Sequence, residues 1–142
     1  MNHQTRVFII GWIGVAIFSA FAVSLTGCGK KDGPVKAYYE NGKTKDEGVF
    51  KSGKLDGPFK RLYKNGQVEL EGIVKSGRLD GPVKSYYETG QIKSESVYKN
   101  GKPDGLSRIY SEKGQLKIEA VYKDGKVEGA FKMYDENGRL KQ

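Results

Sequence analysis

Residues 32–55 read DGPVKAYYENGKTKDEGVFKSGKL, and the pattern of this stretch begins again at positions 56, 80, 104 and 128. Asp-Gly opens this unit and each of the next three, and Glu128-Gly129 opens a fifth. Glycine holds the eleventh and twenty-second positions of every complete unit, and glutamate holds the sixteenth. Such repetition at one fixed period, here twenty-four, indicates a repeat architecture. It predicts units at 32–55, 56–79, 80–103 and 104–127 and a partial unit at 128–142.

The glycines predict two turns in each unit. Asn41-Gly42 and Ser52-Gly53 are pairs typical of type I′ turns, in which both central residues have positive φ. Between the turns lie runs of about eight residues rich in Val, Ile, Tyr and Phe, which favour strands. Each unit therefore predicts two antiparallel strands, and the array predicts an all-β meander of about ten strands.

A two-residue loop at Asn41-Gly42 fixes the register expected for the first hairpin. It places Tyr39 opposite Thr44 and Lys36 opposite Glu47. The same offset predicts three further pairs of opposite charge, which are Lys60 with Glu71, Lys84 with Glu95 and Arg108 with Glu119. Such pairs contribute about 0.2–1 kcal/mol each and oppose a slip in register, which would invert both faces of the sheet.

This register gives the sheet an apolar face and a polar face. In the first two units the apolar face carries Val35, Ala37, Tyr39, Thr44, Phe50, Leu55, Phe59, Tyr63, Val68, Val74 and Leu79. The polar face carries Lys36, Tyr38, Lys45, Glu47 and Lys51. Because the sheet is one layer thick, its apolar face is expected to curl on itself, to meet a partner or to stay partly exposed.

The segment before Cys28 has the parts of a secretory signal peptide. A short positive segment ends at Arg6, and Val7–Ser24 carries no charged side chain. Leu25-Thr26-Gly27-Cys28 resembles the bacterial lipobox, in which the signal is removed before a cysteine that then receives lipid. We therefore expect a signal peptide at 1–27, acyl chains such as palmitate on Cys28, and a lipidated tether at 28–31.

The expected location is the bacterial cell envelope. Gly29 follows the cysteine, and a glycine in place of an aspartate at this position resembles the sorting signal for the outer membrane. In a cell with two membranes, we therefore expect the protein on the periplasmic face of the outer membrane. The alternative is that Val7–Ser24 remains as an uncleaved helix, because its length is close to the minimum that spans a bilayer. Either anchor holds the repeat units outside the cytoplasm.

The scarce residue types argue against an enzyme. His3, Trp12 and Cys28 are the single His, Trp and Cys of the chain. The repeat units therefore lack the groups of a His/Cys metal site, a Ser-His-Asp triad or a disulfide framework. Asp-Gly at the unit starts lacks the alternating ligands of a calcium loop, and we assign it to a turn. We expect no catalytic residue, no metal and no cofactor apart from the covalent lipid.

The unit quoted above resembles the bacterial variant of the MORN repeat, whose pattern runs D-G-x-x-K-x-Y-Y-x-N-G and ends in Y-K-x-G. The resemblance covers residues 32–142, with departures at Leu62 and Ser107. It implies an elongated, curved, single-layer sheet of tandem antiparallel hairpins. Some bacterial proteins with such repeats carry an antitoxin label, and related eukaryotic repeats are associated with membrane or protein binding.

The candidate binding face combines the basic fifth position of the units with the aromatic seventh. Its residues are Tyr38, Tyr86, Tyr110, Tyr134, Lys36, Lys60, Lys84 and Arg108. Tyrosines beside cations contact proteins, sugars or acidic surfaces, and they also pack across strands to stiffen a sheet. The chain has 25 basic and 17 acidic residues, a net charge of +8, which favours an anionic neighbour. Nucleic acid is not expected outside the cytoplasm.

Together these features predict a non-enzymatic, membrane-anchored envelope lipoprotein that acts as a binding or scaffold module. Its expected partners are the membrane, through the lipid, and a protein or an anionic envelope component. Self-association is also open. The alternative is an antitoxin or immunity lipoprotein that neutralises one toxin. A hydrolase or transferase is a third interpretation, for which no single carboxylate stands out.

Overall fold

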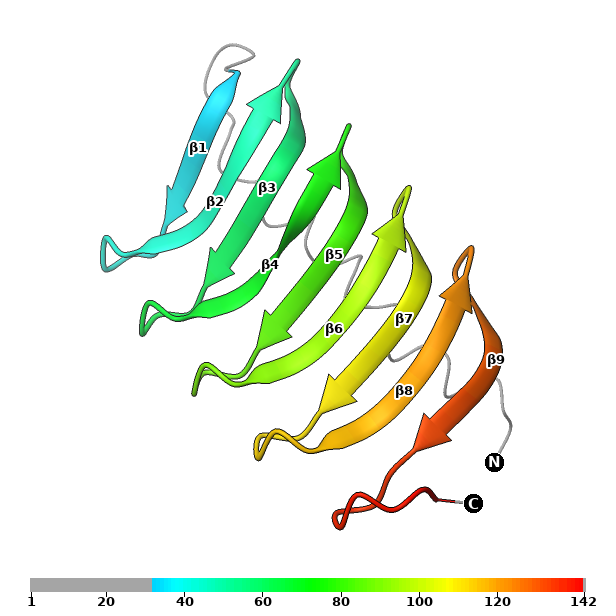
Figure 1. The fold of residues 1–142 in the computed structure, drawn as a ribbon. Coiled ribbons are helices and arrows are strands. Elements are labelled where there is room, and N and C mark those ends of the chain that lie inside the picture. The colour runs from blue at the N-terminus through cyan, green and yellow to red at the C-terminus, as the bar shows by residue number, and fades with distance from the viewer. Residues whose placement is uncertain (1–31, 142) are drawn as a thin grey trace.

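The computed structural model describes residues 32–141, and these form one open antiparallel sheet of nine strands in chain order (Figure 1). The strands are β1 (Gly33–Tyr38), β2 (Thr44–Lys51), β3 (Lys54–Leu62), β4 (Val68–Lys75), β5 (Arg78–Tyr86), β6 (Ile92–Lys99), β7 (Lys102–Tyr110), β8 (Leu116–Lys123) and β9 (Lys126–Met133). The predicted meander of hairpins is confirmed. In place of a tenth strand, a single bridge joins Tyr134 to Leu140. The predicted signal peptide and Cys28 lie outside the described residues.

Two kinds of turn alternate along the sheet. Ser52-Gly53 has positive φ at both residues, as do Ser76-Gly77, Asn100-Gly101 and Asp124-Gly125, which confirms two-residue type I′ turns at one end of the strands. The other end is different. The Tyr39 N–H donates to the Lys43 carbonyl at 2.8 Å, so Glu40, Asn41 and Gly42 form a three-residue loop. The predicted type I′ turn at Asn41-Gly42 is therefore wrong.

The asparagine side chain supports the longer loop in the first two repeats. The Oδ1 atom of Asn41 accepts a hydrogen bond from the Lys43 N–H at 3.1 Å, and Asn65 repeats this contact with the Gln67 N–H at 2.9 Å. This local bond holds the asparagine in a turn in which only the following glycine needs positive φ. A three-residue loop with glycine in that place is the next most common hairpin connection.

The predicted charge pairs are nevertheless confirmed, because two shifts cancel. Tyr38 pairs with Thr44 and Ala37 with Asp46, so Lys45 is an extra, bulged residue on β2. The three-residue loop moves the pairing by one residue, and the bulge moves it back. Lys36 therefore faces Glu47 as expected. Between the bulge and the loop the prediction is wrong, since Thr44 faces Tyr38 and not Tyr39.

The Asp-Gly pairs also depart from the prediction, because they lie in strands and not in turns. Gly48 pairs with Phe59 and Phe50 pairs with Leu55, so Asp56, Gly57 and Pro58 of β3 together face one residue of β2. Gly57 has a φ of 136°, and the equivalent Gly81 and Gly105 have 129° and 130°. Such bulges bend a strand and increase its twist, and the strands in Figure 1 are visibly bowed.

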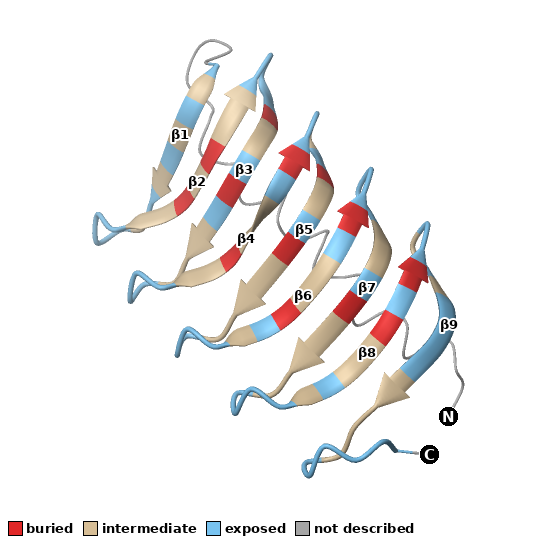
Figure 2. Ribbon diagram, in the orientation of Figure 1, coloured by how far each residue is buried: buried red, intermediate tan, exposed pale blue. Residues whose placement is uncertain are grey.

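Bending lets one layer bury side chains on its inner face. A cluster of buried residues joins β3 to β6, with Phe59 2% exposed and Val74 1% exposed (Figure 2). Its other members are Leu55, Leu70, Leu79, Val83 and Tyr98. A second cluster centres on Ala120 and Tyr122 of β8. The predicted apolar face is thus the inner face, except that Thr44 and Val68 pair with Tyr38 and Leu62 on the predicted polar face.

The inner face also holds polar pairs between neighbouring strands. The Asp46 side chain is 2% exposed, and one of its oxygens accepts a hydrogen bond from Arg61 Nε at 2.7 Å. The hydroxyls of Ser85 and Ser94 are 2.6 Å apart, and those of Ser96 and Ser107 also bond. The buried hydroxyl of Ser107, which departs from the repeat pattern, therefore has a hydrogen-bond partner on the neighbouring strand.

Two hydrogen bonds recur along the sheet, one between neighbouring repeats and one within a repeat. The Tyr39 hydroxyl donates to the Leu62 carbonyl at 2.6 Å. Tyr63 and Tyr87 make the equivalent bonds from the second and third repeats. At the opposite end, an Asp56 carboxylate oxygen accepts the Ser76 N–H at 2.9 Å. Asp80 and Asp104 accept from the next two type I′ turns. The aspartate of Asp-Gly therefore caps the type I′ turn near the end of its own repeat.

The tyrosine bond between repeats is testable by removing one hydroxyl. We expect Tyr63→Phe to lower the free energy of unfolding by about 1 kcal/mol, because it leaves the Tyr86 carbonyl without this donor. Urea denaturation measures the change. The matched control is Tyr38→Phe, since the Tyr38 side chain is 60% exposed. Equal losses in both variants would contradict an inter-repeat role for the Tyr63 hydroxyl.

Candidate interaction face

The outer face of the sheet carries one charged residue from every strand, in a single line. The eight cross-strand pairings join Lys36, Glu47, Lys60, Glu71, Lys84, Glu95, Arg108, Glu119 and Lys132. We call this line the charge row. Its signs alternate without a break, so each glutamate lies between two cations. The predicted basic site residues Lys36, Lys60, Lys84 and Arg108 all belong to it.

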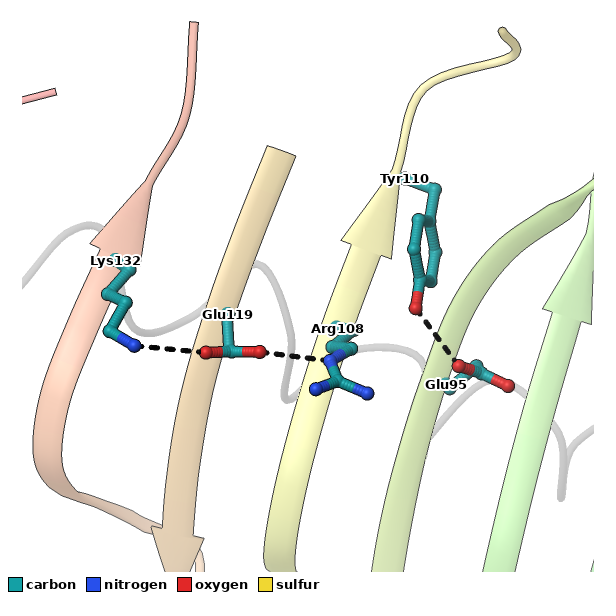
Figure 3. A network of polar contacts seen from close by, with 5 residues as sticks. All are labelled: Glu95, Arg108, Tyr110, Glu119 and Lys132. Carbon is teal, nitrogen blue, oxygen red and sulfur yellow. Dashed lines mark hydrogen bonds and ion pairs between the residues drawn. The ribbon is translucent and has the colours of Figure 1, made fainter. Parts of the chain in front are cut away.

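Ion pairs form at five of the eight pairings of the row. The Lys36 Nζ atom is 2.8 Å from Glu47, and Lys84 Nζ is 2.9 Å from Glu95. Figure 3 shows Glu119 between two cations, with Arg108 Nε at 2.9 Å and Lys132 Nζ at 3.2 Å. The bond from Arg108, followed by that from Lys132, lowers the pKa of Glu119. The bond from Lys84 likewise lowers the pKa of Glu95.

The predicted tyrosines lie beside this row, and two of them bond to it. The Tyr86 hydroxyl donates to Glu71 at 2.7 Å, and the Tyr110 hydroxyl donates to Glu95 at 3.1 Å (Figure 3). Desolvation, followed by the bond to Glu71, raises the pKa of Tyr86 to about 12. Tyr38 ends the edge strand β1 and is 60% exposed, and Tyr134 follows β9. The Tyr86 and Tyr110 hydroxyls therefore position the glutamates of the row.

A second line of residues on the same face was not predicted from the sequence. Pro58 pairs with Ile73, Pro82 with Val97, and Leu106 with Val121, each pair two residues along its strands from the charge row. Side chains two apart share a face. Ile73 is 43% exposed, Val97 and Val121 are 41% exposed, and Leu106 is 38% exposed. With Pro34 and Val49 at one end and Ala130 at the other, we call this line the apolar row.

Glycines in the bulges let the apolar row lie close to the sheet. A Cβ atom at Gly105 would come within 3.1 Å of the Val97 Cβ, and one at Gly57 would come within 3.2 Å of the Val49 Cβ. Each valine therefore packs over the glycine of the next repeat, yet keeps its far side in solvent. A shallow hollow of about 220 Å³ lies between Pro58, Ile73 and Pro82, with Lys60, Glu71 and Lys84 at its rim.

The sequence did contain a signal for the apolar row. The third and eighteenth positions are apolar in every complete unit, with Pro34, Pro58, Pro82 and Leu106 at the third and Val49, Ile73, Val97 and Val121 at the eighteenth. They have the same parity as the charged positions, so strict alternation puts them on the charged face. The prediction of one wholly apolar face and one wholly polar face left no place for apolar residues on the charged side.

Within residues 32–141, no group of three or more His, Cys, Asp or Glu side chains is placed to hold a metal ion. The same residues include no helix long and apolar enough to cross a membrane.

The row of paired glutamates has a consequence for acid stability. Because the folded state lowers the pKa of Glu95 and Glu119 below 4.5, their contribution to stability is present above about pH 4.5. It is lost as the pH falls through the lowered values. We expect urea unfolding to show that this contribution holds from about pH 7 to about pH 5 and is lost as the pH falls further.

The variant Glu119→Gln isolates this effect. It should be less stable than the parent at neutral pH and should lose less stability on acidification, because one lowered pKa is gone. Glu112→Gln, in an exposed loop, is the control and should keep the parent's pH dependence. A parental pH dependence in Glu119→Gln would show that the charge row does not carry the effect.

Comparison with known protein families matches the repeats directly. The family model described as MORN repeat variant matches residues 31–52, 55–76, 79–100, 103–124 and 127–142. Each match begins one residue before a repeat unit, so the matches and the units have the same period. No curated protein sequence matches the chain.

Proposed function

The chain belongs to the MORN repeat variant family, and we propose that it is a non-enzymatic, membrane-anchored binding module of the bacterial cell envelope. Its repeat sheet suits a scaffold, because every repeat adds the same elements to one continuous face. The observation that carries the proposal is the exposed apolar row beside the charge row. Exposed apolar lines with a polar rim are typical of protein interaction surfaces.

The charge row favours a protein as the partner over a polyanion. It has five cations and four carboxylates, so it carries one net positive charge, and each cation faces a glutamate. A polyanion would have to displace these internal ion pairs to bind here. A protein surface with its own apolar strip and mixed charges can match both rows, and alternating charges then fix how the partner is aligned.

Anchoring rests on the sequence from Met1 to Lys31. Acyl chains on Cys28 would hold the module at a membrane, and two or more chains give stable attachment. The tether to β1 is short, because only Gly29, Lys30, Lys31 and Asp32 separate Cys28 from the first strand. The sheet would therefore act close to the membrane surface, on the periplasmic side of the outer membrane in a cell with two membranes.

Crosslinking from the apolar row tests the binding function. A photoreactive residue at Val97 or Val121 in the full chain should capture a specific envelope protein in cells, and one at Thr89, in a loop, should not. We expect Leu106→Asp to reduce capture from Val97 at least about tenfold, since a charge in an apolar contact is poorly tolerated. Thermal unfolding should confirm that the variant remains folded. The same capture from Thr89 as from Val97 would contradict the proposal.

The captured protein also separates a scaffold from a neutraliser. Several envelope proteins would fit a scaffold, whereas a single toxin whose effect is relieved by this chain would fit an antitoxin or immunity lipoprotein. Anchoring is tested separately by fatty-acid labelling, which should disappear in Cys28→Ala. Labelling that persists in that variant would contradict lipid attachment at this residue.

A further inference from the structure

The outer edge of β9 is the place where the repeat pattern is incomplete. Among residues 32–141, β9 pairs along its length only with β8, and the carbonyl of Met133 accepts the Lys141 N–H at 2.7 Å. The exposed edge therefore runs up to Lys132. Phe131 is 42% exposed, whereas the equivalent Phe59 and Val83 are 2% and 5% exposed because a further strand covers them. Unpaired edge strands are templates for further pairing.

The pairing rules inside the sheet say what such a strand would need. On the side of β3 that corresponds to this edge, Gly57 faces Val74, Pro58 faces Ile73, Phe59 faces Gly72 and Lys60 faces Glu71. A glycine thus faces a bulky side chain, two apolar residues face each other, and a cation faces a glutamate. The next repeat follows the same scheme, with Lys84 facing Glu95.

The sequence of β9 satisfies these rules against itself. Residues 128–132 read Glu-Gly-Ala-Phe-Lys. In an antiparallel pair centred on Ala130, Glu128 of each copy would face Lys132 of the other, and Gly129 would face Phe131. Each of these pairs is then of a kind found in the internal ladders, and the two apolar rows meet at Ala130. We propose that β9 pairs with β9 of a second copy of this chain around a two-fold axis.

The first strand does not offer the same edge. Its corresponding residues, 32–36, read Asp-Gly-Pro-Val-Lys, with Pro34 at the centre. Proline lacks a backbone N–H and is one of the residues that protect exposed strand edges from pairing. Ala130 replaces this proline in β9.

A mixed contact of β1 with β9 is also unfavourable. If the outer faces of the two copies lie on the same side, these two strands run parallel, because all odd-numbered strands of the meander point the same way. Aligning the rows would then place Lys36 opposite Lys132, and like charges directly opposite are destabilising. The β9 pair is therefore preferred over an open chain of copies.

Charge reversal tests the pairing on the full chain in detergent solution. We expect the parent to show a concentration-dependent dimer in sedimentation. Glu128→Lys alone should weaken it at least about tenfold, because two cations then face two cations. Lys132→Glu alone should weaken it similarly. Glu136→Lys, which changes the charge by the same amount in the terminal loop, should leave the dimer unchanged.

Mixing the two charge variants gives the decisive result. In a mixed pair, the lysine introduced at position 128 of one variant faces the glutamate introduced at position 132 of the other. The unchanged Lys132 and Glu128 also face each other, so a heterodimer should form where neither variant dimerises alone. A monomeric parent, or a mixture that stays monomeric, would overturn the proposal. The outcome does not depend on Cys28 or on capture from Val97, so it is separate from the tests of anchoring and partner binding.

Discussion

Register is the constraint on which the rest of this structure depends. Side chains alternate between faces with a period of two, so a slip of one residue would carry the charge row onto the inner face. In each repeat a three-residue loop and a bulged residue shift the pairing in opposite directions and cancel. The alternating charges then favour the resulting register at all eight strand pairs.

Bulges explain how a single layer has both a buried and an exposed apolar surface. The Asp-Gly bulges bend the strands around Phe59 and Val74 on the inner face. The same glycines leave space on the outer face for the valines of the preceding repeat. The aspartates beside them cap the type I′ turns of their own repeats. One sequence pair therefore provides curvature, packing between repeats and a capped turn within each repeat, and stability accumulates from neighbour to neighbour.

The sequence was sufficient for those features that depend on the period and parity of the chain. The strand pairs, the facing of Lys36 and Glu47 and the burial of Val74 all follow from spacing and hydrophobic pattern. The loop at Asn41-Gly42 did not follow, because an Asn-Gly pair is equally compatible with a three-residue loop in which only the glycine has positive φ. The bond from Tyr86 to Glu71 depends on the stagger between β5 and β4 along the strand direction, which side-chain alternation alone does not specify.

The ends of a repeat array pose a problem that its interior does not have. Every internal strand has its apolar and charged residues matched on both sides, whereas the last strand is matched on one side only. Phe131 and Lys132 show the consequence, since the equivalent residues of β3, β5 and β7 are buried or lie between two glutamates. A self-complementary last strand resolves this with the residues already present in the repeat. It would also join two outer faces into one two-fold symmetric surface, so the proposed protein partner would meet two equivalent apolar rows. For a partner with two binding sites, binding at one row would raise the effective concentration of its second site at the other row.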